Sequence, residues 1–318
     1  MDEPSFERVN YALRPNKSVQ RKIVVQMLSR VGAGGRFSFQ DYRYVGMGSI
    51  WFADFILMHR LVGITDLVSI ERDASREKRI EFNRPFSCIT VKIGLTSEEI
   101  PKLDWNKSTI VWLDYDDPLR RYMFEDFEAV IRRLHSGDVL ITTVNASVDQ
   151  IQGIKEGGTL LEPEVALRQA CGDENVPIDV APDLTSNAFP SVVGKIFTNA
   201  FITLTARLHS DLRFAPLLNV TYEDTARMVS CCGMVVNDSD GEKLLASHVE
   251  NEEYFAGRGQ FEIRVPHLTH KERLEFNKLL PCVAPPDPTE LPFELKPKEI
   301  ESYWKFYLQY PAYEELQP

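Results

Sequence analysis

The sequence predicts an α/β fold built on a mostly parallel sheet. Apolar strand patterns alternate with helical patterns up to about residue 145, which is the order that produces parallel strands. Residues 109–113 are an almost continuous apolar run, as expected for a strand in the middle of such a sheet. A long apolar helix is then predicted at 189–208, and two β-rich segments at 213–222 and 226–236 predict a terminal antiparallel hairpin.

The first strand and the turn after it are the segment around which this prediction is organised. Three of the four residues at 42–45 are β-branched or aromatic, and the segment runs into two glycines in the turn at 46–49. A buried helix is predicted at 50–62, and a second strand at 67–70 ends at Glu71. Strand, glycine turn, helix, strand and acid form a nucleotide-binding unit, in which the acid can accept hydrogen bonds from a ribose.

The spacing of this unit narrows the class of cofactor. Gly46 and Glu71 are 25 residues apart, with strand and helix patterns where they belong. A dinucleotide fingerprint needs a third glycine, and Trp51 stands at that position. Its bulk argues against a helix packed under a pyrophosphate, and so against NAD or FAD. A single-nucleoside cofactor without phosphates fits better, and S-adenosylmethionine is the commonest of these.

The composition is that of an ordinary globular protein. Among 318 residues, 43% are hydrophobic and 26% are charged, and the formal net charge is −11. An acidic chain repels nucleic acid and anionic lipid. No apolar run approaches the ~20 residues of a membrane span, and the acidic start at residues 1–5 argues against a secretory signal. The five cysteines, an odd number, predict reduced thiols and a cytoplasmic protein.

We expect one large domain and a C-terminal extension. Residues 1–236 form the predicted α/β domain, with a polar insertion near 146–190 that contains a pair of adjacent glycines. Residues 237–318 are predicted to pack on the core as an extension. This extension begins with a loop at 237–241 and continues with a strand at 260–265. A helix capped by Thr269 and Glu272 and a last helix at 298–309 follow.

The first predicted helix, residues 16–31, begins with a group of cations: Arg14, Lys17, Arg21 and Lys22. Cations at the start of a helix oppose its dipole. Two interpretations follow from this pattern. The cations can form a solvated charged surface, or they can contact an anion or a substrate near the cofactor. A flexible loop of glycine and alanine is expected at 32–35.

Three short motifs resemble a known family. Residues 44–48 resemble its first cofactor motif, 69–71 its acidic second-strand end, and 113–115 the motif after its fourth strand. The family is that of the class I S-adenosylmethionine-dependent methyltransferases, and more narrowly a group of bacterial O-methyltransferase-like proteins. Because one α/β domain has about this size, the resemblance covers roughly residues 40–235. The tail at 263–269 resembles only the narrower group.

The resemblance implies a Rossmann-like, seven-stranded, mostly parallel sheet and S-adenosylmethionine as the cofactor. Asp114, at the carboxyl edge of the central strand, is expected to orient or deprotonate the substrate, and Tyr115 to flank the adenine or the acceptor. The alternative for Asp114 is a structural acid that accepts hydrogen bonds from loop amides. The expected cofactor contacts are Gly46, Met47, Gly48, Ser49, Glu71, Arg72 and Asp114.

The chain departs from the family pattern at three places, and one of them is the position of a metal-binding acid. Tyr44 stands where the family has an acid, and the third glycine is missing. Val144 and Asn145 stand where metal-dependent members have Asp-Asn, so we expect no magnesium site. Asp116 or Asp117 could supply a carboxylate, but we do not expect either to do so. The His267-x-x-His270 pair lacks further ligands at a suitable spacing.

These observations predict a methyltransferase that acts on a small molecule or a protein. The resemblance implies that the methyl group is transferred to an oxygen. The alternative is a catalytically silent methyltransferase-like subunit that binds a nucleotide or scaffolds a multi-protein assembly, which the imperfect first motif favours. Nucleic-acid methylation is disfavoured, because the chain is acidic and lacks the Asn/Asp-Pro-Pro-aromatic signature.

Overall fold

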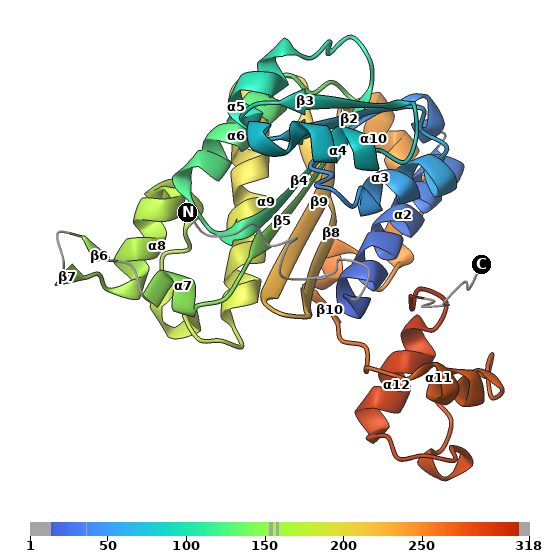
Figure 1. Ribbon diagram of the computed structural model, residues 1–318. Helices are drawn as coiled ribbons and strands as arrows, with labels where there is room; N and C mark the ends of the chain where they lie inside the picture. Colours follow the sequence, from blue (N-terminus) through green and yellow to red (C-terminus); the bar gives the residue numbers. More distant parts are fainter. Residues whose placement is uncertain (1–13, 36, 153–154, 157–158, 312–318) are drawn as a thin grey trace.

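The main sheet has eight strands in the computed structural model, which describes residues 14–35, 37–152, 155–156 and 159–311. Their order across the sheet is β10-β8-β9-β5-β4-β1-β2-β3 (Figure 1). The strands are β1 (Arg43–Gly46), β2 (Asp66–Glu71), β3 (Ile89–Ile93), β4 (Thr109–Pro118), β5 (Val139–Asn145), β8 (Arg213–Glu223), β9 (Arg227–Val236) and β10 (Phe261–Ile263). The neighbouring strands β5, β4, β1, β2 and β3 are parallel to one another. Strand β9 is antiparallel to both β5 and β8.

The predicted α/β class and the terminal antiparallel hairpin are therefore confirmed, but the expected number of seven strands is wrong. The eighth strand is β10, which pairs parallel to β8 through Phe261 and Val220. An uncovered β8 would expose a row of unpaired backbone groups at the sheet edge. The strand predicted at 260–265 supplies the cover, and the sequence pattern did not indicate its partner.

Helices cover both faces of the sheet, as expected for alternating strands and helices. One face carries α2 (Pro15–Gly35), α3 (Ala53–Leu57) and α10 (Asp238–Leu245), and the other carries α6 (Arg121–Ile131), α8 (Pro163–Cys171) and α9 (Phe189–Leu208). Besides several short 3-10 helices, the chain forms α4 (Glu77–Asn83), α5 (Thr96–Glu99), α7 (Asp149–Gln152), α11 (His270–Asn277), α12 (Pro297–Phe306), the π-helix η3 (Met58–Val62) and the small hairpin of β6 (Lys155–Glu156) and β7 (Thr159–Leu160).

Three local predictions differ from the structure. The helix expected to start at residue 50 begins at Ala53, because Ser49 and Phe52 adopt left-handed backbone angles, with φ of 50° and 47°. Helix α2 continues to Gly35 through the segment expected to be a flexible loop. Residues 238–245 form a helix where a loop was expected, because the side chain of Asn237 caps its first turn.

The part of the C-terminal extension after β10 is a small helical group (Figure 1). The predicted capping box of Thr269 and Glu272 is confirmed at the start of α11. The ring of Phe306 in α12 contacts the ring of Phe261 in β10, with centroids 5.9 Å apart. The division of the chain at residue 236 stays a prediction. The acidic start at 1–5 and the glycines at 157 and 158 lie outside the described residues.

No helix within the described ranges is long and apolar enough to cross a membrane.

Candidate functional site

Three neighbouring strands, β2, β1 and β4, end at one edge of the sheet. Gly46 at the end of β1 lies beside Ser69 of β2, and Val45 lies beside Val111 of β4. The carboxyl ends of parallel strands are where open α/β sheets bind ligands. The sheet therefore brings Glu71, the glycine loop (residues 46–49) and Asp114 to the same edge, in that order across it.

The glycine loop is attached to the end of β2 by hydrogen bonds. The backbone N–H of Ser49 donates to Oε1 of Glu71 at 2.8 Å, and that of Gly48 donates to the hydroxyl of Ser69 at 3.0 Å. The Ser69 hydroxyl donates in turn to the same Glu71 oxygen at 2.7 Å. Burial raises the pKa of Glu71, although these donors oppose the shift. Glu71 thus lies at the carboxyl edge of the sheet and also holds the glycine loop in place.

The second glycine of the loop is required by packing. A Cβ atom on Gly48 would lie 2.6 Å from Cδ1 of Phe52 and 2.9 Å from the hydroxyl of Ser69. The left-handed conformations of Ser49 and Phe52 cost about 1–3 kcal/mol each and mark a loop held in a set shape. Trp51, at the position of the missing third glycine, faces outward and is 39% exposed. Its bulk therefore does not prevent the turn.

Asp114 lies within β4, at the point where the strand passes the glycine loop. Its Oδ2 atom forms an ion pair with the ammonium of Lys17 at 2.7 Å, and the two side chains are only 15% and 1% exposed. Burial alone would raise the pKa of Asp114, but the charges of Lys17 and Arg21 outweigh it and hold the pKa below its usual range. Asp114 is thus a fixed, ionised carboxylate.

The cations at the start of α2 face the interior. Arg14, Lys17 and Arg21 are all less than 9% exposed. For these three residues the solvated-surface interpretation is wrong. Lys22 is half-buried and donates to the carbonyl of Tyr310 at 3.3 Å. Contact of the buried cations with an anion or a substrate stays a proposal.

Asp54 is a residue of this edge that the sequence analysis missed. It accepts a short hydrogen bond from the hydroxyl of Tyr44, the residue that stands where the family has an acid. Burial raises the pKa of Asp54, and the charge of Arg21 opposes this effect. The signal in the sequence was a single acid inside the apolar run at 50–57. The carboxylate of Asp54 in α3 thus lies beside Tyr44 of β1, close to the carboxyl edge of the sheet.

Several buried polar atoms of the same region form no hydrogen bond within the described part of the chain. They are both amide atoms of Gln20, Nε of Arg21, Oδ1 of Asp114 and the hydroxyl of Tyr222. The charges of Asp114 and Arg21 act on Tyr222, so these three groups lie near one another. Gln20 precedes Arg21 in α2. A buried polar atom without a partner costs about 1–3 kcal/mol, so these atoms mark a place where water or a ligand would complete the hydrogen bonds. In the sequence, the only indication of this group was Gln20, a polar residue between apolar positions of the predicted helix.

Three expected site residues lie away from this group. Tyr115 is buried, and its hydroxyl donates to Asp126 of α6 at 2.8 Å, so its ring packs under that helix. Met47 is half-buried against the apolar core on the α6 face. Arg72 follows β2 and is exposed. The structure therefore brings together Glu71, the loop backbone and Asp114, and it leaves Tyr115 out.

The position of the expected metal acid holds a buried valine. Val144 is fully buried in β5, and the side-chain oxygen of Asn145 accepts the N–H of Ser147 at 2.9 Å. Asp117 accepts a hydrogen bond from Tyr122 at 3.0 Å. Over the described ranges, no group of three or more histidine, cysteine or acidic side chains is placed to hold a metal ion.

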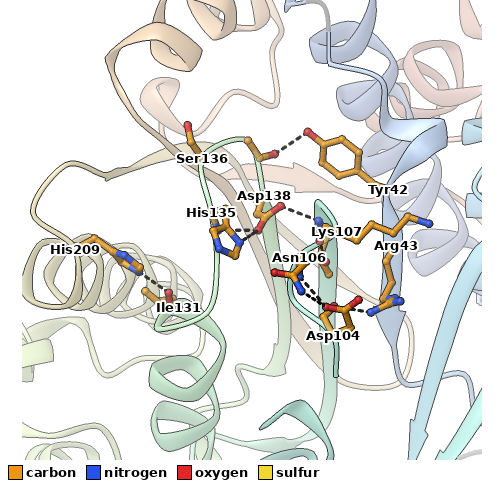
Figure 2. Close-up of polar contacts among 12 residues, drawn as sticks. Tyr42, Arg43, Asp104, Asn106, Lys107, Ile131, His135, Ser136, Asp138 and His209 are labelled. Atoms are coloured by element: carbon orange, nitrogen blue, oxygen red, sulfur yellow. Dashed lines mark hydrogen bonds and ion pairs between the residues drawn. The ribbon is translucent and has the colours of Figure 1, made fainter. Parts of the chain in front are cut away.

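Polar side chains also gather at the opposite edge, where the parallel strands begin (Figure 2). A hollow of about 570 Å³ is found there, lined in part by His135 and His209. His209 bonds to the carbonyl of Ile131 at 2.7 Å, and buried Asp138 accepts the N–H groups of His135 and Thr109. The contacts of Asp138 tie the starts of β4 and β5 together, and the bond of His209 joins the segment after α9 to α6.

Comparison with known protein families decides the family. The model of the family described as "Putative O-methyltransferase" matches residues 9–318. The chain belongs to this family. The match confirms the resemblance found in the short motifs and extends it through the C-terminal extension. None of the curated proteins compared matches the chain.

Solved structures of low similarity accompany the family match. A complex of Trm1 from Pyrococcus horikoshii with S-adenosyl-L-methionine has 13% identity and a TM-score of 0.45, covering 77% of this chain and 61% of its own. An O-methyltransferase from Bacillus cereus in complex with SAH has 14% identity and a TM-score of 0.38, covering 72% and 86%. These values are too low to carry an argument about this family member.

Proposed function

We propose that this family member is an S-adenosylmethionine-dependent O-methyltransferase whose cofactor lies across the ends of β2, β1 and β4. The observation that carries the proposal is the 2.8 Å bond between the Ser49 N–H and Glu71, which joins the glycine loop to the acid expected to receive a ribose. Family membership supports the same assignment.

Each residue of the edge has a role in this proposal. The backbone of Gly46 and Gly48 faces the nucleoside. Oε2 of Glu71, which takes part in neither the bond from Ser49 nor that from Ser69, accepts from the ribose hydroxyls. When bound, S-adenosylmethionine supplies an electrophilic methyl group on a sulfonium. The chain positions the acceptor oxygen in line with that methyl group and excludes water.

Asp114 orients the bound molecules in this proposal. A general base works best with a pKa near the working pH, and the ion pair with Lys17 lowers the pKa of Asp114. The acceptor is an oxygen of a small molecule or a protein. The odd number of cysteines, all of them free, supports a cytoplasmic location.

A second candidate is the catalytically silent subunit, which binds the cofactor and serves an assembly. The observation that favours it is the same ion pair, because it occupies the acid that is expected to act on the acceptor. Release of S-adenosylhomocysteine from S-adenosylmethionine with a panel of phenolic and carboxylic acceptors separates the two functions. Binding without release on any acceptor supports the silent subunit.

Calorimetry with S-adenosylhomocysteine, ATP and NAD tests the cofactor assignment. S-adenosylhomocysteine should bind and, at 100 times its Kd, stabilise the fold by about 2.7 kcal/mol. Glu71→Gln keeps an oxygen for Ser49 but replaces the ribose acceptor, so affinity should fall by about 1.5–3 kcal/mol. Glu77→Gln, at an exposed position of α4, is the matched control. Binding of ATP or NAD instead of S-adenosylhomocysteine would exclude the proposal.

A further inference from the structure

The first turn of α2 is capped by a residue from a distant part of the chain. The helix has no acidic residue in its own first turn, and Asp224 lies in the turn between β8 and β9. Its two carboxylate oxygens accept the backbone N–H groups of Asn16 and Lys17, each at 3.0 Å. The N–H groups at a helix start need such acceptors, and a negative charge there is favourable to the helix dipole. Asp224 therefore fixes the backbone from which the side chain of Lys17 extends.

The side chain of Asn16 joins this cap to the C-terminal extension. Its Nδ2 atom donates to the carbonyl of Glu223 at 2.9 Å and to Oδ1 of Asp224 at 3.1 Å. Its Oδ1 atom accepts the backbone N–H of Val265, just after β10, at 2.7 Å. Asn16 and Val265 are only 3% and 4% exposed, so their bond is shielded from water. One amide thus connects the start of α2, the turn after β8 and the extension.

The extension contacts α2 at a second point, further along the helix. The ammonium of Lys22 donates to the carbonyl of Tyr310 at 3.3 Å. The hydroxyl of Tyr310 donates to the carbonyl of Pro266 at 3.0 Å and accepts the N–H of Leu268 at 3.2 Å. These bonds hold the extension together and against α2. They do not involve the helical turn that carries Lys17, so they separate the general stability of the extension from its effect on that turn.

We propose that Asn16 is a positioning residue through which the C-terminal extension holds the ion pair of Lys17 and Asp114 in place. The proposal rests on the function proposed above, in which Asp114 orients the bound molecules. Asn16 acts through Lys17 and not on the ligand. It holds the first turn of α2, and the ammonium that extends from this turn lies 2.7 Å from Oδ2 of Asp114. The extension is thereby part of the methyltransferase site.

A buried ion pair depends strongly on the position of the backbone that carries it. Lys17 is 1% exposed, and a charge removed from water is favourable only while the geometry of its pair is good. A shift of the first turn of α2 would move the ammonium away from Asp114 and allow this carboxylate to turn. A misplacement of about 1 Å by a change far from the chemistry can lower a rate by roughly 10²-fold. A first turn held from two sides prevents such a shift.

Three substitutions in the full chain test this role. Asn16→Ala removes the donor and the acceptor of the side-chain amide but keeps the backbone bond to Asp224. Asp224→Asn is a second variant, because it keeps one acceptor oxygen and replaces the other by an NH₂ group, which cannot accept a backbone N–H. Tyr310→Phe is the matched control. It removes the two hydrogen bonds of the hydroxyl inside the extension and leaves the first turn of α2 untouched.

Calorimetry with S-adenosylhomocysteine measures the effect on the site. Asn16→Ala and Asp224→Asn should weaken its binding roughly five- to tenfold, as expected for groups coupled through one network. Tyr310→Phe should bind it as tightly as the unsubstituted chain does. Urea unfolding of the same proteins should show that Asn16→Ala and Tyr310→Phe both lower the stability of the fold. A loss of affinity in only one of them then does not come from general loosening.

A double-mutant cycle shows whether Asn16 acts through Lys17. The ion pair is absent in Lys17→Met, so the addition of Asn16→Ala should not weaken S-adenosylhomocysteine binding further. If Lys17→Met does not fold, Asp114→Asn supplies a background in which the carboxylate of the pair is missing, and the same result is expected there.

Unchanged affinity in Asn16→Ala and Asp224→Asn would overturn the positioning role and leave the cofactor assignment intact. An equal loss of affinity in Tyr310→Phe, or additive losses in the double variant, would do the same, because the extension would then act only on the stability of the fold. Failure of the unsubstituted chain to bind S-adenosylhomocysteine would overturn the cofactor assignment and the positioning role together.

Discussion

The ammonium of Lys17 lies 2.7 Å from Oδ2 of Asp114, and this ion pair joins the first turn of α2 to the carboxyl end of β4. The two groups come from segments almost 100 positions apart in the sequence. Both are largely removed from water, so their attraction is screened far less than that of a surface pair. The pair therefore sets both the position of α2 over the sheet and the charge of Asp114.

Removal of the ammonium should destabilise the fold. Lys17→Met keeps the length of the side chain but leaves the carboxylate of Asp114 buried and unpaired. Breaking one side of a buried pair costs about 3–5 kcal/mol, and we expect a loss near the lower value because Asp114 keeps some exposure. Urea unfolding at neutral pH measures this loss.

The control for this variant is Lys102→Met, which removes an exposed ammonium 2.6 Å from Glu99. A surface pair of this kind contributes about 1 kcal/mol or less. The contribution of the Lys17 pair should also depend on pH. The pKa of Asp114 is lowered in the folded state, so the stabilisation is present above the unfolded value of about 3.9 and is lost as the pH falls through the folded value. Equal losses in the two variants would contradict the structural role of Lys17.

Most of the sheet could be predicted from local sequence patterns. The strands are short apolar runs bounded by turns, and their parallel direction follows from the alternation with helices. The eighth strand was predicted as an element, but its place beside β8 was not. Pairing with β8 depends on contacts about 40 positions apart, such as Phe261 with Val220, and no local pattern encodes them.

The candidate site was predicted where it depends on the backbone. Gly48 and Glu71 were found because a turn needs a glycine and a ribose site needs an acid at the end of a strand. The burial of the cations on α2 was not found, because helical periodicity shows which residues share a face but not what that face meets. Tyr115 was expected near the ligand from its position after Asp114. Neighbours in a strand point to opposite faces, and Tyr115 is bonded to Asp126.

The buried acid Asp138 should make stability depend on pH. Burial raises its pKa to about 7 in the folded state, above the usual value of about 3.9. Between these values the folded chain binds more protons than the unfolded chain, so stability should fall as the pH rises, by up to about 1.4 kcal/mol per unit. Asp138→Asn should reduce this slope. Unfolding curves from pH 4 to pH 7 measure it, and parallel slopes in the two proteins would refute the assignment.

Methyl transfer by this chain should need Asp114 but no divalent metal. The carboxylate of Asp114 is already paired with the ammonium of Lys17, and the side-chain oxygen of Asn145 accepts the N–H of Ser147. Val144, at the position of the second metal acid, offers no ligand. Asp114→Asn should lower turnover by less than the roughly 10²- to 10⁴-fold that a general base contributes, because the lowered pKa of Asp114 suits an orienting role.

Turnover measured in EDTA distinguishes metal-independent methyl transfer from a metal-assisted reaction. Turnover and the affinity for S-adenosylhomocysteine should be the same in EDTA and in millimolar Mg²⁺, because Mg²⁺ requires near-octahedral oxygen ligands and usually one or two free carboxylates. Loss of turnover in EDTA and recovery on adding Mg²⁺ would show that Asp116 or Asp117 turns toward the edge and supplies them. Asp117→Asn then identifies which acid is used, since its bond to Tyr122 would already have been given up.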